Sequence, residues 1–250
     1  MDKRTNNQEK TGLLLLNLGG PERQEDVRPF LLNLFSDRKI IRLGPPFMQK
    51  IIARIIAFRR APKSMANYRL IGGGSPIRVK TEEQAAALEA ALVKDGWFMV
   101  RACMRYWHPF ADEVLHELRD AGVSRLVALP LYPHYSIATT GSSVNDLQRH
   151  LARLGGQWPL QVIEAWPTEP AFIACLAERI AEGLAAFGEQ PVQVVYSAHS
   201  LPVQFIEEGD PYVQHLQQTI AAVEALTGVD GKLCYQSRSG PVKWLGPALP

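Results

Sequence analysis

Short apolar runs alternate with amphipathic stretches along most of this chain. The apolar runs have the length and residue types of β-strands, and they predict strands at residues 13–18, 97–104, 125–131, 160–165, 192–198 and 232–236. Apolar residues at helical spacing predict helices at residues 24–35, 47–60, 81–94, 110–121, 143–153, 169–187 and 212–226. Near-continuous apolar strands that alternate with helices are typical of a parallel sheet covered by helices on both faces.

The predicted fold class is therefore α/β, with two doubly wound, Rossmann-like lobes. The Gly155-Gly156 break predicts a first lobe at residues 1–153 and a second at residues 154–250. The second lobe has only about three predicted strands, and we expect it to be incomplete, because a doubly wound lobe usually needs more strands to close its core. Ligands of such sheets bind beyond the carboxyl ends of the strands, so residues at those ends are the candidates for function.

The composition is globular, with 46% hydrophobic and 21% charged residues. A formal net charge of +2 gives no reason to expect nucleic acid as a partner. The charge is unevenly spread, however, because residues 37–63 carry eight Lys or Arg against one acid, Asp37. A basic patch of this size suits an anionic ligand or a membrane surface.

The cysteines and the N-terminal residues indicate in which cellular compartment the protein is expected. Cys103, Cys175 and Cys234 lie far apart and form no CxxC pair, so neither a disulfide framework nor a structural zinc site is expected. The polar start lacks a signal-peptide apolar region, and no apolar run approaches the length of a membrane span. We therefore expect a soluble, cytoplasmic protein.

Two glycine-rich stretches follow predicted strands or helices. LLLLNLGGP at residues 13–21 is either a simple strand-to-helix turn or a loop where the backbone approaches a flat ligand, and it lacks the GxGxxG spacing of a dinucleotide site. IGGGSPI at residues 71–77 lacks the Gly-Lys-Ser/Thr of a P-loop. It has more glycines than a turn needs, and Pro76 suits the start of the following helix.

Two further strand ends carry polar and aromatic side chains. In RYWHP at residues 105–109, Arg105 could pair with a carboxylate and the aromatics could stack on a planar ligand, but a surface arginine beside core aromatics is an equally good interpretation. LPLYPHYSIATTGSS at residues 129–143 is rich in hydroxyls and ends at a predicted helix start. Ser142 is a candidate N-cap there, and the unpaired N–H groups of that turn favour an anion.

The stretch at residues 46–60 is apolar on one helical face and basic elsewhere. Met48, Ile51, Ile52, Ile55 and Ile56 share that face. One interpretation is an ordinary helix that packs on the core, and the other is a helix that rests on a membrane surface.

His199 stands in SAHSLP, where the predicted strand 192–198 meets a loop. A buried histidine is more often structural than catalytic, but this one lies at the edge where ligands bind. As a catalyst it could be a proton acceptor, a metal ligand or the base of a Ser–His hydrolase. The GxSxG and HExxH motifs are absent, which weakens the hydrolase and metalloprotease hypotheses.

Taken together and in this order, the stretches resemble the ferrochelatases, which insert Fe(II) into a porphyrin. The matching residues are LLLLNLGGP (13–21), RAPKSMANYRLIGGGSPI (60–77), RYWHPF (105–110), YPHYSIATTGSS (132–143), SAHSLP (197–202), GDPY (209–212) and QSRSGPVKWLGP (236–247). Each motif alone is weak, but their collinear order makes the resemblance specific.

The resemblance implies two Rossmann-like lobes with a porphyrin cleft between them. It implies that His199 is the catalytic imidazole and a ligand of the metal in transit, and that Fe(II) and protoporphyrin IX or coproporphyrin III are the substrates. The residues it assigns to the cleft or its bordering loops are Leu18, Arg105, Tyr106, Tyr135, Ser136, Ser142 and Trp244. Residues 38–63 match the family's lip, which implies possible contact with the inner face of the cell membrane.

The same resemblance indicates two departures. Ile137 stands where cluster-bearing members have a cysteine, so no iron–sulfur cluster and no other tightly bound cofactor is expected. The chain ends shortly after WLGP, whereas the family pattern continues with an acidic motif that faces the catalytic histidine. We therefore expect a truncated form, and the resemblance does not decide whether such a form has full activity. The alternatives are a porphyrin-binding protein with impaired catalysis and a related cobalt or sirohydrochlorin chelatase.

Overall fold

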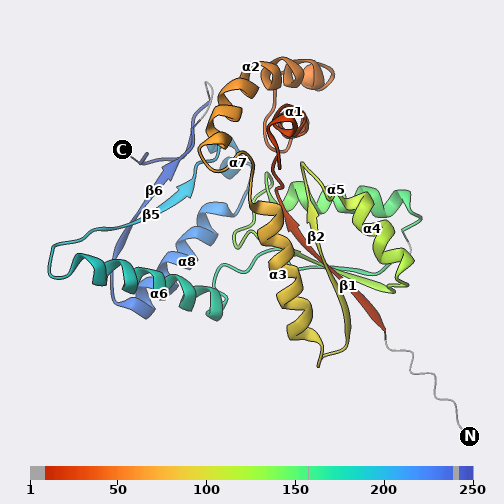
Figure 1. The fold of residues 1–250 in the computed structure, drawn as a ribbon. Helices are drawn as coiled ribbons and strands as arrows, with labels where there is room; N and C mark the ends of the chain where they lie inside the picture. Colours follow the sequence, from red (N-terminus) through yellow and green to blue (C-terminus); the bar gives the residue numbers. More distant parts are fainter. Residues whose placement is uncertain (1–8, 157, 239–241, 250) are drawn as a thin grey trace, which may run out of the picture. The chain divides into compact units, whose positions relative to one another are not determined.

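The structure is a computed structural model that describes residues 9–156, 158–238 and 242–249. The described chain divides into two compact units (Figure 1). The first consists of the described residues up to Tyr132 together with Ile137–Glu164. The second consists of Pro133–Ser136 and the described residues from Ala165 onward.

The first unit is built on a parallel sheet with the strand order β2-β1-β3-β4. Its strands are β1 (Lys10–Asn17), β2 (Trp97–Met104), β3 (Arg125–Pro130) and β4 (Leu160–Val162). β1 is central, and its Leu14 pairs with Arg101 on one side and with Ala128 on the other. The chain leaves β1 towards β2 and leaves β3 towards β4, so the connections diverge beyond the carboxyl ends of β1 and β3, where such sheets bind ligands. The predicted α/β class with parallel sheets is confirmed.

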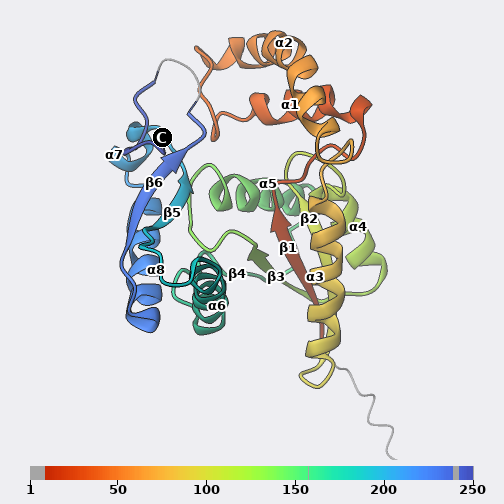
Figure 2. The same ribbon diagram turned by 60° about the vertical axis from the view of Figure 1, so that its left-hand side comes forward.

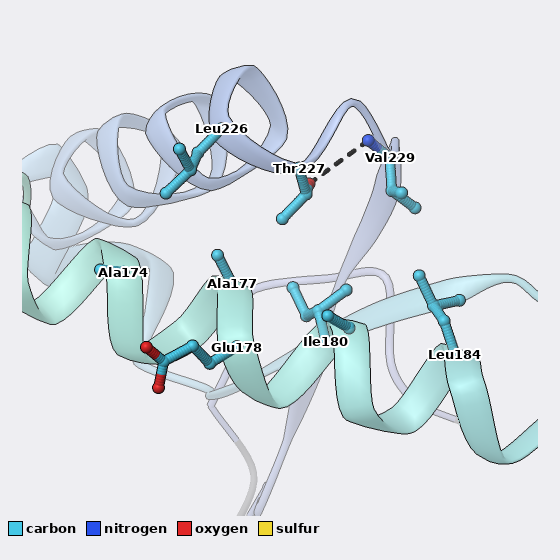
Figure 3. Close-up of a pocket in the computed structure, with 9 residues that line it drawn as sticks. Ala174, Ala177, Glu178, Ile180, Leu184, Leu226, Thr227 and Val229 are labelled. Atoms are coloured by element: carbon cyan, nitrogen blue, oxygen red, sulfur yellow. Dashed lines mark hydrogen bonds between the residues drawn. The ribbon is translucent and has the colours of Figure 1, made fainter.

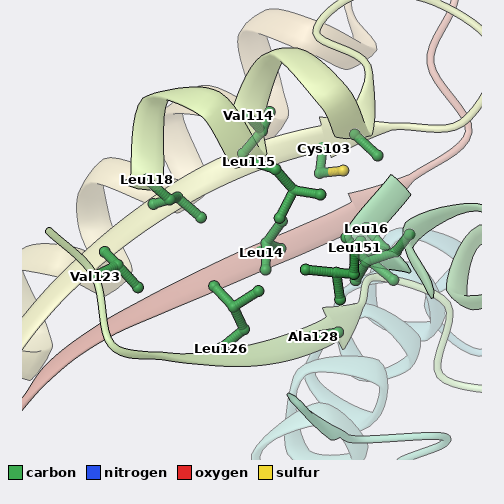
Figure 4. Packing of buried hydrophobic residues seen from close by; sticks show 12 residues of the cluster. Leu14, Leu16, Cys103, Val114, Leu115, Leu118, Val123, Leu126, Ala128 and Leu151 are labelled. Carbon is green, nitrogen blue, oxygen red and sulfur yellow. The ribbon is translucent and has the colours of Figure 1, made fainter. Parts of the chain in front are cut away.

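Helices cover both faces of this sheet. The first unit contains η1 (Gln24–Asp26), α1 (Val27–Ser36), η2 (Pro46–Met48), α2 (Gln49–Arg69), α3 (Ile77–Leu92), α4 (Ala111–Asp120) and α5 (Thr140–Arg153). Because side chains alternate along a strand, Leu14 and Leu16 of β1 pack with α4 and α5 (Figure 4), whereas Leu13 and Leu15 pack on the face of α3.

The buried face of α2 differs from the predicted one. The helix packs on α1 mainly through alanines four residues apart, Ala53, Ala57 and Ala61, with the partly buried Ile56 beside them. Ile51 and Ile55 are 53% and 49% exposed. Small side chains at a helix–helix contact let the two backbones approach closely.

The second unit has a smaller sheet with two parallel strands (Figure 2). Its elements are α6 (Pro170–Phe187), β5 (Val194–His199), α7 (Val203–Glu207), α8 (Tyr212–Thr227) and β6 (Gly231–Gln236). Ala198 and Tyr235 of the strands pack on Leu216 of α8. β5 is not buried on both faces as the sequence predicted, since Val195 is 45% exposed while Ala198 is buried.

Two local expectations were wrong, and one short helix was missed. Ser142 is not an N-cap, because α5 begins two residues earlier at Thr140 and the Ser142 hydroxyl hydrogen-bonds outside its own helix. α2 continues past the predicted end to Arg69 with Pro62 inside it, since its first turns are held by packing on α1. The short helix α7 follows Pro202 and was not predicted, because five residues are too few to show a helical period.

Candidate functional site

The turns after β1 and β2 lie side by side at the carboxyl end of the first sheet. The backbone N–H of Arg105 donates to Asn17 O at 2.9 Å, and that of Tyr106 donates to Leu18 O at 3.0 Å. Gly19 has a φ of 79°, and a Cβ there would come within 3.0 Å of Trp107 N. These contacts bring three predicted site residues, Leu18, Arg105 and Tyr106, to one edge of the sheet.

Side chains from three separate segments meet at this edge. Arg105 donates through Nη2 to Asp37 Oδ2 at 2.8 Å and through Nε to Ser142 Oγ at 2.8 Å. Tyr106, which is 1% exposed, donates through its hydroxyl to Asp37 Oδ2 at 2.7 Å. Ser142 Oγ also donates to Asp37. The structure therefore places Arg105, Tyr106 and Ser142 around one carboxylate.

This carboxylate is held ionised by its neighbours. Burial alone would raise the pKa of Asp37, but hydrogen bonds from Ser142, Tyr106 and the Lys39 N–H, together with the charge of Arg105, lower it below its usual range. Burial, reinforced by the charge of Asp37, raises the pKa of Tyr106, so its phenol keeps its proton. At neutral pH the cluster therefore consists of a carboxylate, a guanidinium and two neutral hydroxyls.

An open hollow of about 540 Å³ borders the cluster. It is lined by Asn33, Ser36, Asp37, Arg38, Arg105, Phe110, Asp112, Asp146, Arg149 and His150. Arg105 Nη1 lies 3.5 Å from Asp146 Oδ1, so the guanidinium stands between two carboxylates. The hollow is polar, and charges of both signs line it.

Asp37 was missed as a site residue at the sequence level. It lies 68 residues before Arg105, and nothing in its local pattern indicates a partner so far along the chain. The available signal was its isolation, since it is the one acid in the basic segment 37–63. A lone carboxylate among eight cations is expected to be paired.

The two glycine motifs meet in the first unit. Ser75 N donates to Pro21 O at 2.7 Å, so IGGGSPI lies against the turn after β1. Gly72 and Gly73 have φ values of 98° and 97°, which favour glycine. A Cβ on Gly74 would lie 2.1 Å from Glu22 O. The third glycine is therefore explained by close packing of two backbone segments.

In the second unit, Tyr135 and Ser136 are tied to the region around α8. Ser136 is 1% exposed and donates through Oγ to Asp210 Oδ2 at 2.8 Å. The backbone N–H of Tyr135 donates to His215 Nδ1 at 3.1 Å. The GDPY motif at residues 209–212 thus supplies the carboxylate that holds this loop.

His199 is the last residue of β5, and its side chain is exposed. Its carbonyl accepts a hydrogen bond from Tyr212 OH at 3.2 Å, whereas its ring makes no hydrogen bond to any described residue. Partial burial lowers the pKa of the ring, so it is neutral at physiological pH. A neutral imidazole without a partner can accept a proton or ligate a metal ion.

Trp244 lies on the segment that pairs with the loop after β5. It forms an isolated bridge with Pro202, and Leu245 N donates to Leu201 O at 3.0 Å. The indole Nε1 is buried and has no hydrogen-bond partner among the described residues. Trp244 is therefore joined to the loop that His199 begins.

The second unit contains an apolar hollow of its own. It has a volume of about 380 Å³ and lies between α6 and the end of α8 (Figure 3). Ala177, Ile180 and Leu184 of α6 line it opposite Leu226. None of the predicted site residues is among the described residues that line it, and its one titratable group is Glu178. This groove is separate from the candidate site.

Comparison with known proteins decides the family. The family model for ferrochelatase matches residues 10–250. This chain belongs to the ferrochelatase family. The ferrochelatase of Desulfotalea psychrophila is 56% identical over 240 residues, which cover 96% of this chain and 75% of that protein. Those of Geobacter metallireducens and Geotalea uraniireducens are 52% and 51% identical over 242 residues, covering 96% of this chain and 76% and 75% of theirs.

The match covers every stretch on which the resemblance was based, from LLLLNLGGP at 13–21 to the WLGP ending at 247. The recognition of the family from the sequence is therefore confirmed. The roles of the individual site residues stay predictions, and so does the absence of a resident cluster.

Proposed function

We propose that this member of the ferrochelatase family inserts Fe(II) into a free-base porphyrin to form haem, with His199 as the proton acceptor. The activity follows from the family, and its substrates are a porphyrin and iron. The observation that supports His199 is an imidazole at the carboxyl end of β5 that is open to solvent on one side, makes no hydrogen bond to a described residue, and has its pKa lowered by partial burial. The porphyrin of the proposal is protoporphyrin IX or coproporphyrin III.

The reaction explains why a neutral imidazole is needed. Two pyrrole nitrogens of the porphyrin must lose their protons as the metal enters. A neutral imidazole accepts a proton in the physiological range and is also a good ligand for Fe(II), whereas an imidazolium can do neither. Partial burial disfavours the charged form of His199. The ring therefore stays mostly neutral at pH values where an ordinary histidine is already half protonated.

The test is an anaerobic assay with a free porphyrin and Fe(II), followed through the porphyrin absorption bands. His199→Ala is expected to lower the insertion rate by about 10²- to 10⁴-fold, the usual contribution of a positioned acid–base group. The wild-type rate should fall only as the pH drops below about 6.5, because the pKa of His199 is lowered.

The matched control is His116→Ala, which removes an exposed imidazole from α4 and should leave the rate unchanged. Full activity of His199→Ala would show that the imidazole is structural. A wild-type chain that shifts the porphyrin spectrum without inserting iron would instead be a porphyrin-binding protein with impaired catalysis, and preference for cobalt would indicate a related chelatase.

We also propose that the segment 38–63 makes peripheral contact with the cytoplasmic face of a membrane. Phe47, Ile51, Ile55 and Phe58 are between 49% and 78% exposed, and exposed basic side chains, including Lys50, accompany them. Apolar side chains beside cations suit an anionic lipid surface. Among the described residues, no helix has the length and hydrophobicity to cross a bilayer.

We further propose that the chain holds no iron–sulfur cluster. Ile137 occupies the loop position where cluster-bearing members have a cysteine. Cys103 is buried on β2, whereas Cys175 and Cys234 lie on α6 and β6 of the other unit. In this proposal iron is a substrate only.

A further inference from the structure

The carboxylate of Asp37 accepts hydrogen bonds from four neighbouring residues. Oδ2 accepts from Arg105, Tyr106 and Ser142, and Oδ1 accepts from the backbone N–H of Lys39 at 2.8 Å. Ser142 has one hydroxyl proton and gives it to Asp37, so its oxygen is left to accept from Arg105 Nε. The Tyr106 hydroxyl also lies 3.0 Å from Ser142 Oγ, so the two hydroxyls and the carboxylate form one closed group beside the guanidinium.

The consequence is that Arg105 has a single orientation. Its Nε faces Ser142, its Nη2 faces Asp37, and its Nη1 lies 3.5 Å from Asp146. The guanidinium carbon also lies 4.7 Å from the centroid of the Tyr106 ring. The side chain is 16% exposed, and the exposed part borders the hollow of about 540 Å³.

A fixed guanidinium recognises a carboxylate by direction more than by net charge. Its planar N–H groups can bind both oxygens of a carboxylate when the plane is presented correctly. Asp37 and Asp146 already balance the positive charge of Arg105, so simple attraction for an anion is weak. The orientation that Asp37 imposes is then what gives Arg105 selectivity.

We propose that Asp37 is a positioning residue that holds Arg105 so that the guanidinium binds a carboxylate side chain of the porphyrin. This inference rests on the proposed function, since it needs a porphyrin with acidic side chains as the substrate. Asp37 itself does not touch the substrate. A change at Asp37 should therefore alter the selectivity for free carboxylates and should leave proton transfer unaffected.

The experiment compares the Kd of a dicarboxylic porphyrin with that of its dimethyl ester, measured through the absorption shift on binding. The wild-type chain should bind the free acid more tightly. Asp37→Asn should lower this preference by about tenfold, because the amide cannot accept all the charge-assisted bonds of the carboxylate. Asp120→Asn is the matched control, since it removes an exposed carboxylate of α4 that does not line the hollow and should leave the preference unchanged.

The possible results distinguish failure of the positioning role of Asp37 from failure of the proposed function. An unchanged preference in a folded Asp37→Asn variant overturns the positioning role, and so does an equal loss in Asp120→Asn. Wild-type binding of neither porphyrin would instead contradict the proposed function. If Asp37→Asn does not fold, Ser142→Ala removes the acceptor of Arg105 Nε and must lower the preference several-fold, and an unchanged preference there overturns the proposal equally.

Discussion

At the scale of single residues, the backbone of Gly74 lies so close to Glu22 that no side chain can stand between them. A Cβ on Gly74 would be 2.1 Å from Glu22 O, a distance that real structures avoid. The neighbour is a backbone atom, so a rotamer change cannot relieve the clash. The loop after α2 and the turn after β1 would have to move apart.

We expect Gly74→Ala to lower the free energy of unfolding by about 2–3 kcal/mol, as overpacking against backbone does. Denaturant titration would measure the change. Gly183→Ala on α6 is the control, because a Cβ there meets nothing within 4 Å and alanine favours a helix. Equal stability of Gly74→Ala and the wild type would mean that the two backbone segments separate without cost.

Part of the candidate site could be predicted from single residues. Arg105 and Tyr106 directly follow a predicted strand, which made that stretch a candidate, and the family resemblance rather than position alone assigned them and Ser142 to the site. Asp37 could not be found in this way, because it follows a helix and its partners are far away in sequence. The sequence identifies residues at strand ends, but the pairings between them depend on how the strands are ordered.

At the scale of elements, strand positions were predicted within about three residues, because apolar runs of strand length are locally distinct. α2 shows where such patterns fail. Hydropathy favours the isoleucine face, but Ala53 and Ala57 form the face against α1. The choice depends on how closely a neighbouring helix can approach, and one segment alone does not contain that information.

The exposed face of α2 makes membrane contact testable at this scale. Phe58→Ser should weaken binding to anionic vesicles by about tenfold, because one buried phenylalanine contributes roughly 1.5–3 kcal/mol. Phe187→Ser on α6 should have no effect, although Phe187 is 54% exposed and Phe58 is 62% exposed. Sedimentation with anionic and neutral vesicles measures both variants.

Binding should also weaken at high salt, because lipid charges attract the basic side chains of segment 38–63. Equal binding of the wild type to anionic and neutral vesicles would contradict the electrostatic part of the proposal. An equal loss in both variants would contradict the assignment of the contact to α2.

At the scale of the whole molecule, the α/β class and the parallel sheets could be predicted because strand–helix alternation extends along the chain. The order β2-β1-β3-β4 could not, since no local signal records which strands become neighbours. The two units also differ in burial. Leu14, Leu15 and Leu16 of β1 are at most 1% exposed, whereas Val195 of β5 is 45% exposed.

This difference predicts unequal local stability. Amide hydrogens of β1 should exchange with solvent at least about 100-fold more slowly than those of β5, because a central strand with two buried faces opens only with its whole unit. Hydrogen–deuterium exchange read by mass spectrometry measures both segments in one experiment. Equal exchange rates would mean that the two units open together.

The central place of β1 also has a consequence for synthesis on the ribosome. β1 emerges early, but it pairs only with β2, which begins at Trp97, and with β3, which begins at Arg125. Until those segments are translated, the four leucines at positions 13–16 have no strand beside them and no core to enter. The nascent chain therefore carries these four leucines unpaired for most of the translation of the first unit, which is the interval when chaperones and slow non-local pairing matter most.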